Sequence, residues 1–286
     1  MKIGINVMPV PAAELAAIGQ RVEALGFEGL YYGEHIAVPM HLKTPYPGKI
    51  GYHGKVTQLE CYVALGHLAA VTRRVRLATG LSVLPIRHPL QTARAITTID
   101  NLSGGRFDLI VGLGSIPDEY EAMNVDYRTR GARLDEWLDI LDKLWTQDEI
   151  EHHGRFMNFE AIGFEPKPVQ RPGPPLYLGA YTAVGFERAA RRATGWYGDI
   201  NSPAKLREVI AEFTPILEKH GRDPASFKYK LIHAAGVDDL PSRDELADYA
   251  DAGADCIVVS PFELEEKAAA DKLERVAEAF RPYLTF

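Results

Sequence analysis

Strand and helix patterns alternate along this chain, and this alternation constrains the fold more than any other feature. Short apolar runs are each followed by a longer segment with helical periodicity, which favours parallel strands covered by helices. The predicted strand–helix pairs are 3–7 with 11–25, 28–32 with 57–70, 74–84 with 89–101, 106–113 with 129–145, 174–179 with 182–193, 196–200 with 203–219, 227–236 with 242–252, and 255–260 with 263–281.

Eight such units favour an α/β fold of the (β/α)8 TIM-barrel type, in one domain over residues 1–286. A chain of 286 residues is within the size range of a single barrel. The first four strands and the last are apolar on both faces, as parallel strands buried between two layers are. The pattern at 196–200 is the weakest, and an open sheet is the alternative if this segment is not a strand.

Charge and composition exclude several classes of protein. The net charge of −7 argues against a general nucleic-acid surface. The N-terminus lacks a signal-peptide pattern, and no stretch approaches 18 apolar residues, so we expect no membrane span. Cys61 and Cys256 are isolated in the sequence and belong to no zinc motif. We therefore expect a reduced, cytoplasmic protein without a metal site.

Two segments do not fit the strand–helix repeat. Residues 33–56 follow a strand, so they lie on the face where barrel enzymes place their chemistry, and they carry Tyr46, Tyr52 and His53. Their length is that of a lid or binding loop rather than a simple connection. Residues 146–173 follow a helix instead, so we expect them on the opposite face or along the side of the barrel.

Glycines interrupt two of the predicted strands. Gly80 and Ser82 lie inside the 74–84 run, and Gly112 and Gly114 flank Leu113 where the 106–113 run ends. Glycine inside a strand marks a bulge or a close approach of the backbone to another group. We therefore predict that a ligand lies against these strand ends, although small residues packed inside an ordinary barrel are the alternative.

Several longer segments occur in a characteristic order. They are EHI after the second strand, LATGLSVLPIRHPLQTARAITTIDNLSGGRFDLIVGLG, RGARLDEWLDILDKLW, PPLYLGAYTAVGFERAARRATGWYG and GADCIVVSP. Together they closely resemble the bacterial luciferase-like flavin and deazaflavin oxidoreductases, over nearly the whole chain. The resemblance implies a barrel that binds a flavin-type ring at the C-terminal ends of its strands.

The resemblance implies a role for each glycine-containing strand end. In this family a bulge at 79–83, often with a non-proline cis peptide, lies behind the ring. The small-residue loop at the end of the fifth strand, together with the following helix N-terminus, would hold the cofactor phosphate. Thr182 as a plain helix cap is the competing account of that loop. The predicted cofactor-binding residues are Thr79, Gly80, Leu81, Ser82, Leu113, Gly114, Gly179, Ala180, Tyr181 and Thr182.

His35 is the predicted catalytic residue. The family commonly has an imidazole at this position near the ring, and histidine exchanges a proton near neutral pH. A hydrogen-bonded loop histidine is the alternative, and Glu34 would either orient the imidazole or be solvated. Trp196 occupies a position typical of the family, where we expect it to pack in the core.

The compact chain resembles the deazaflavin branch, which implies hydride transfer between coenzyme F420 and a small organic substrate. A sugar-phosphate substrate is disfavoured, because Ser115 stands where sugar-oxidising members carry a glutamate, with Asp118 and Glu119 further along. One alternative is an FMN-dependent monooxygenase supplied with reduced flavin by a partner reductase. The other is a barrel that binds a ligand without catalysis. A homodimer is compatible with all three.

Overall fold

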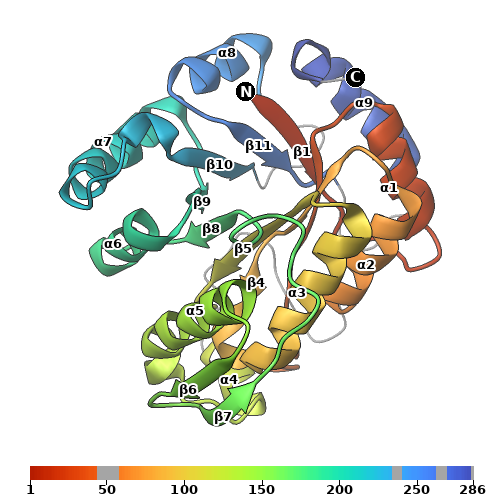
Figure 1. Cartoon of the computed structure of the whole chain (residues 1–286). Helices are drawn as coiled ribbons and strands as arrows, with labels where there is room; N and C mark the ends of the chain where they lie inside the picture. Colours follow the sequence, from red (N-terminus) through yellow and green to blue (C-terminus); the bar gives the residue numbers. More distant parts are fainter. Residues whose placement is uncertain (44–57, 234–239, 262–268, 285–286) are drawn as a thin grey trace.

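The computed structural model describes residues 1–43, 58–233, 240–261 and 269–284. Parallel strands form the centre of the molecule, and helices surround them (Figure 1). The strands are β1 (Lys2–Asn6), β2 (Gly29–Tyr32), β3 (Arg76–Thr79), β4 (Ser82–Val83), β5 (Phe107–Gly112), β8 (Leu176–Gly179), β9 (Gly195–Asp199), β10 (Lys228–His233) and β11 (Cys256–Val259). Since β3 and β4 occupy one position, the sheet has eight strand positions.

The sheet is closed. Its order is β3-β2-β1-β11-β10-β9-β8-β5-β4, and β3 also pairs with β5, where Leu77 is opposite Phe107. The predicted (β/α)8 barrel is therefore confirmed, and the open-sheet alternative is excluded. The weakest predicted strand is present as β9, which pairs with β8 on one side and β10 on the other.

Some of the helices begin or end at residues that the sequence marks clearly. Ser202 caps the helix that starts at Pro203, with its side chain accepting the Lys205 N–H, and Gly104 ends another helix in the left-handed conformation with φ +66°. The helices are α1 (Leu15–Ala24), α2 (Cys61–Val71), α3 (Pro89–Ser103), α4 (Pro117–Ala122), α5 (Arg130–Thr146), α6 (Ala183–Arg192), α7 (Pro203–Lys219), α8 (Arg243–Asp251) and α9 (Ala269–Phe280).

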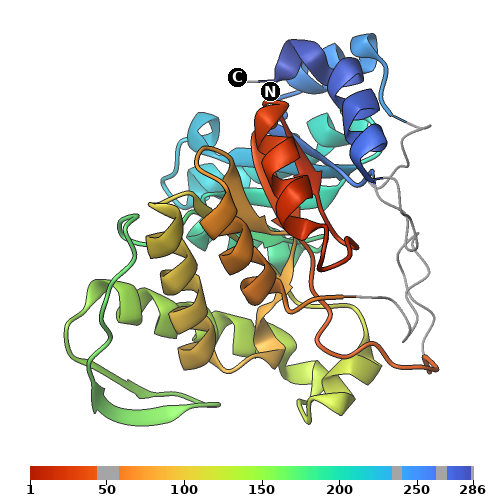
Figure 2. The same cartoon turned by 90° about the vertical axis from the view of Figure 1, so that its right-hand side faces the viewer.

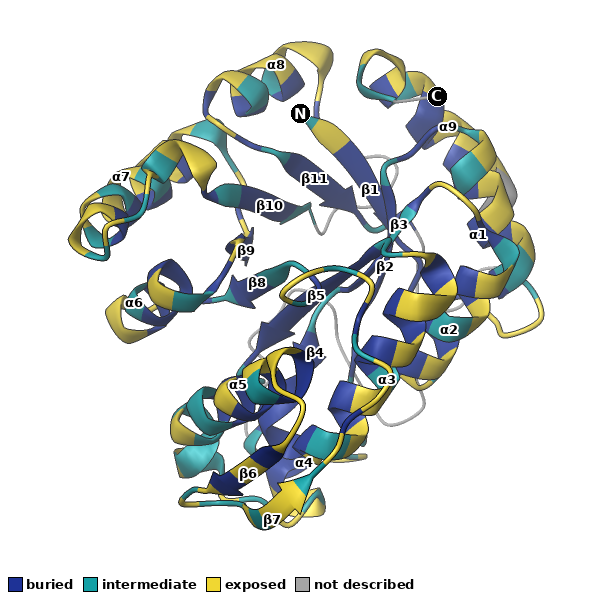
Figure 3. Ribbon diagram, in the orientation of Figure 1, coloured by how far each residue is buried: buried dark blue, intermediate teal, exposed yellow. Residues whose placement is uncertain are grey.

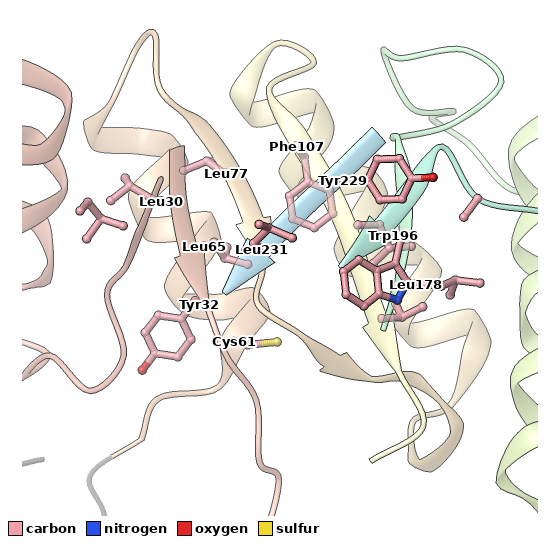
Figure 4. Close-up of a cluster of buried hydrophobic side chains, with 14 of the residues drawn as sticks. Leu30, Tyr32, Cys61, Leu65, Leu77, Phe107, Leu178, Trp196, Tyr229 and Leu231 are labelled. Atoms are coloured by element: carbon pink, nitrogen blue, oxygen red, sulfur yellow. The ribbon is translucent and has the colours of Figure 1, made fainter. Parts of the chain in front are cut away.

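Side chains of the strands alternate between two layers. Leu30 and Tyr32 of β2 belong to the large apolar cluster between the barrel and the helices, which also contains Trp196 and Leu178 (Figure 4). Tyr31, between them, belongs to a second cluster on the other face of the strands. Figure 3 shows the consequence, because the strands of the barrel are almost entirely buried while the helices around them expose their outer faces.

The inner cluster contains a buried ion pair. Lys230 Nζ of β10 lies 2.6 Å from Asp108 Oδ2 of β5, and it also donates to the Tyr31 hydroxyl at 3.1 Å. Arg76 Nε donates to both Asp108 oxygens at 3.2 Å. Burial raises the pKa of Asp108, but the charges of Lys230 and Arg76 outweigh it and hold that pKa below its usual value.

Two connections differ from the regular pattern. Residues 146–173 contain a hairpin of β6 (Ile150–His153) and β7 (Asn158–Ile162), which extends away from the barrel in Figure 2 (green). Of the long segment 33–56, residues 44–56 lie outside the described residues, and with them Tyr46, Tyr52, His53 and the predicted lid. The described helices include none that is long and apolar enough to cross a membrane.

Candidate active site

A cavity of about 700 Å³ opens at the C-terminal ends of the barrel strands. Because parallel strands all end on the same side, this face gathers residues that are distant in the sequence. The cavity is lined by Asn6, Met8, Gly33, Glu34, His35, Gly80, Leu81, Val83, Gly112, Leu113, Gly114, Ser115, Tyr127, Arg130, Leu134, Leu178, Gly179, Ala180, Tyr181, Thr182, Gly185, Arg188, Tyr197, Asp199, Ile232 and Ser260.

The Gly80–Leu81 peptide forms part of the cavity wall, and it is a non-proline cis peptide. It lies in the break between β3 and β4, within the segment where the family resemblance implies such a bond. The Leu81 side chain rests against two glycines of neighbouring strands. A Cβ at either Gly112 or Gly179 would come within 2.8 Å of a Leu81 methyl carbon. These two glycines therefore make room for Leu81.

Gly114 has a different reason to be glycine. Its φ is +68°, and a Cβ there would lie 2.6 Å from Val83 Cγ1. Both the backbone conformation and the neighbouring side chain exclude a larger residue. Gly33, Gly80, Gly112 and Gly179 also line the cavity, so backbone atoms form part of its wall, and glycine allows a ligand to approach the backbone closely.

Thr79 and Ser82 lie behind this wall and are absent from the cavity lining. The Thr79 hydroxyl donates to the Ile110 carbonyl at 2.6 Å and accepts the Ile110 N–H at 2.8 Å. The Ser82 hydroxyl donates to Glu34 Oε2 at 2.7 Å. Both hydroxyls therefore connect neighbouring strand ends within the protein. The other predicted cofactor-binding residues, from Gly80 to Thr182, all line the cavity.

His35 lines the cavity and is held by a carboxylate. Its Nδ1 lies 3.0 Å from Glu119 Oε2, and the two side chains are only 11% and 2% exposed. A carboxylate accepts a hydrogen bond from Nδ1–H, so this pairing favours the tautomer whose lone pair is on Nε2. Glu119 thus fixes the orientation of the imidazole and favours one of its two tautomers.

Glu119 was not among the predicted site residues, because it is 84 positions from His35 in the sequence. It belongs to the short helix α4, and it also accepts the backbone N–H of Ile36 at 2.6 Å. Asp118, its neighbour, accepts the Lys43 N–H at 3.0 Å. Helix α4 therefore anchors the chain that follows His35. Glu34, by contrast, directs its carboxylate away to Arg87 and Ser82, so it neither orients the imidazole nor is solvated.

The end of β8 leads directly into the N-terminus of α6. Thr182 caps this helix, with its hydroxyl accepting the Gly185 N–H at 3.2 Å. The Trp196 indole is fully buried, as expected. It donates to the Ala180 carbonyl at 2.8 Å and so holds the loop between β8 and α6 in place. The Tyr181 hydroxyl accepts the Asp199 N–H at 2.7 Å. The helix N-terminus is therefore presented to the cavity in a fixed orientation.

Arg130 and Arg188 also line the cavity, and neither is among the site residues predicted from the sequence. Arg188 is held by Asp135 through two hydrogen bonds of 2.7 and 3.0 Å. Arg130 lies over the Tyr127 ring at 3.8 Å and donates to the Tyr127 carbonyl. Within the described ranges Arg130 has no carboxylate partner, and its buried Nε has no hydrogen-bond acceptor.

Arg130 is also the first residue of α5, where a helix favours negative charge rather than positive charge. An arginine at this place costs stability unless an anion offsets its charge. Together with the N-terminus of α6, Arg130 therefore forms a site suited to an anionic group such as a phosphate.

The closed barrel, the cavity at its strand ends and the histidine held by a buried carboxylate define a barrel protein with an enzyme-like ligand site. A family model described as luciferase-like monooxygenase matches residues 3–282. The chain belongs to this family, whose members include oxidoreductases and monooxygenases.

The chain is similar to curated proteins in sequence and to solved structures in fold. An uncharacterized protein of Mycobacterium tuberculosis is 33% identical over 282 residues, 95% of this chain and 93% of that protein. The oxygenase component of a flavin-dependent trigonelline monooxygenase from Acinetobacter baylyi is 31% identical over 62% of this chain and 46% of its own. The structure of an F420-dependent secondary alcohol dehydrogenase superposes with a TM-score of 0.79 at 15% identity, over 100% of this chain and 99% of that chain.

Proposed function

We propose that this protein is an oxidoreductase that transfers a hydride between coenzyme F420 and a small organic substrate. The observation that carries this proposal is the cavity itself, which combines a partly backbone-lined wall, an anion site and a half-buried imidazole within one space of about 700 Å³. Such a combination suits a cofactor with a flat ring at one end and a phosphate at the other.

The residues present fit such a cofactor. The orphaned Nε of Arg130 and the N-terminus of α6 would hold the phosphate, while the wall at Gly80–Leu81 would lie behind the ring. When bound, the deazaflavin supplies the carbon that accepts or donates a hydride. Gly179, Ala180, Tyr181 and Thr182 line the same cavity where β8 leads into α6.

The chain supplies the proton chemistry. His35, oriented by Glu119, would take a proton from a substrate hydroxyl at Nε2, or return it in the reverse direction. The carboxylate of Glu119 stabilises the imidazolium that this step produces. The side chains of Leu81, Val83 and Ile232 add apolar surface to the same space, which would limit access of water to the ring once the cofactor is bound.

An FMN-dependent monooxygenase is the second candidate. The relative from Acinetobacter baylyi, an oxygenase component, supports it. In that case a partner reductase would supply the reduced flavin. A barrel that binds a ligand without catalysis is the third possibility, and the histidine oriented by a carboxylate inside the cavity favours the two catalytic functions over it.

Fluorescence titrations of the purified protein with F420 and with FMN test the assignment. We expect tighter binding of F420. Tenfold tighter binding of FMN, a difference of about 1.4 kcal/mol, would contradict the proposal and favour the monooxygenase. Tight binding of either cofactor without turnover of small alcohols or carbonyl compounds would support the third possibility.

Replacing Arg130 by Gln should weaken the binding of F420 and FMN by roughly 10- to 100-fold, the effect of losing a hydrogen bond to a charged group. Riboflavin, which has the ring of FMN but no phosphate, should lose little affinity. Arg128→Gln is the matched control, because Arg128 is exposed near the same helix start and pairs with Asp126. Equal losses for FMN and riboflavin would place the phosphate elsewhere.

A further inference from the structure

Glu34 is a buried carboxylate surrounded by donors from several segments of the chain. Its side chain is 2% exposed. Oε2 accepts from the Ser82 hydroxyl at 2.7 Å and from the Val83 N–H at 2.8 Å. Oε1 accepts from Arg87 Nε at 2.6 Å and from the Cys61 thiol at 3.3 Å. A buried charge with this many partners is fully compensated.

The hydrogen bond from the Val83 N–H to Glu34 takes the place of a backbone hydrogen bond that the sheet lacks here. Regular pairing between β2 and β3 ends where Tyr32 is opposite Thr79, and the Gly80 N–H makes the last contact, to the Tyr32 carbonyl at 2.7 Å. Beyond the Gly80–Leu81 peptide, β4 pairs with β5 on one side only. On the other side of β4, the Glu34 carboxylate accepts the Val83 N–H, where a neighbouring strand would otherwise offer a backbone carbonyl.

Arg87, in the chain that follows β4, binds the same carboxylate. It pairs with Glu34 and also with Glu60, the residue that caps α2. Its guanidinium lies 4.8 Å from the centre of the Tyr62 ring, and the Tyr62 hydroxyl donates to Ser82 at 3.0 Å. The segment 82–87 is therefore tied at both ends to one carboxylate, that of the residue before His35.

We propose that Glu34 is a positioning residue, which holds the Leu81–Val83 segment in place behind the cofactor ring. The ring contact rests on the function proposed above, whereas the hold on the segment does not. Since Glu34 precedes His35 directly, one residue sets the distance between the wall behind the ring and the imidazole.

Glu34→Gln tests this role. The glutamine amide has one accepting oxygen where the carboxylate has two, so Val83 or Arg87 must lose its partner. In the ligand-free protein, hydrogen exchange of a peptide covering 81–86 should become at least about tenfold faster. Glu60→Gln is the matched control, since it alters the exposed partner of Arg87 and leaves Ser82 and Val83 untouched.

The second measurement concerns the ring. Glu34→Gln should weaken the binding of F420 and of the phosphate-free deazaflavin riboside by the same factor, at least about tenfold. A general loss of structure would also weaken the binding of the phosphate, and F420 would then lose more affinity than the riboside. The ratio of the affinities for F420 and the riboside therefore distinguishes a local effect at the ring from general unfolding. If Glu34→Gln does not fold, Ser82→Ala removes one donor and should show both changes at a smaller size.

Unchanged exchange over 81–86, or the same increase in Glu60→Gln, would overturn the proposal. Faster exchange with unchanged affinity for the deazaflavin riboside would also overturn it, because the segment would then have no effect on the ring. If the wild-type protein binds neither F420 nor FMN, the proposed function fails, and the exchange measurement alone decides whether Glu34 holds the segment.

Discussion

His35→Ala should lower turnover by roughly a hundredfold or more, while the dissociation constant of the cofactor changes only modestly. A positioned general acid or base contributes about 10²- to 10⁴-fold to the rate. The imidazole lines the cavity and is oriented by Glu119 at 3.0 Å, which is the geometry that such a role requires. Turnover is measured as the change in deazaflavin absorbance with a panel of small alcohols and ketones.

Glu119→Gln extends this experiment. The amide oxygen of glutamine can still accept from Nδ1–H, but it carries no charge to stabilise the imidazolium. We expect a smaller loss of turnover than in His35→Ala, and no further loss in the double variant, because the two residues act as one unit. His67→Ala, on the exposed face of α2, is the control and should have no effect.

Two results would contradict the assignment. A loss confined to cofactor binding would make His35 a residue that positions the ring. Unchanged turnover and unchanged binding would make it a structural histidine that serves to anchor helix α4 to the chain after β2.

Asp108→Asn should lower the free energy of unfolding by about 3–5 kcal/mol at pH 7, the cost of removing one partner of a buried ion pair. The substitution leaves the Lys230 ammonium, which is 5% exposed, inside the barrel without its anion. Replacing Lys230 by Met in the same chain should recover part of the loss, since no isolated charge is then buried. Urea unfolding at equilibrium measures these differences, provided that unfolding is reversible.

Asp139→Asn is the control for this experiment. Asp139 is half exposed and pairs with Arg192 at the surface, so its replacement should cost less than about 1 kcal/mol. Equal losses in the two variants would show that the inner ion pair contributes no more than a surface pair.

The dependence on pH follows from the lowered pKa of Asp108. An acid whose pKa is lower in the folded state stabilises the fold above its unfolded pKa, about 3.9, and this contribution is lost as the pH falls through the folded pKa. The difference between wild type and Asp108→Asn should therefore be constant from pH 5 to pH 8 and decrease below about pH 4. A difference that decreases between pH 8 and pH 5 would contradict this explanation.

The sequence determined the barrel and most of its strands. Runs such as 109–111 and 256–259 are apolar throughout, since parallel strands are buried on both faces, so their pattern is visible without the structure. The starts of α3 at Pro89, α6 at Ala183 and α7 at Pro203 are also within one residue of their predicted places, because Pro at a first turn and a Thr or Ser cap are local signals. The first helix, predicted from residue 11, begins only at Leu15.

The sequence also marked the strand ends that line the cavity. Glycine is rarely placed inside a buried strand without a reason, and Gly80, Gly112 and Gly114 all lie in the wall. The sequence could not distinguish the side chains that face the cavity from those that lie behind its wall. Thr79 and Ser82 adjoin Gly80 and Leu81 in the sequence, but the break between β3 and β4 leaves both hydroxyls bonded inside the protein.

The tertiary structure alone decided which charged groups meet. Glu119 reaches His35 across 84 positions, Arg87 reaches Glu34 across 53, and Lys230 reaches Asp108 across 122. None of these pairs has a local signature, because each depends on how the strands and the loops after them are arranged around the closed barrel. Local patterns are set by backbone propensity and burial over a few residues, whereas the partner of a buried charge is set by the closure of the whole sheet.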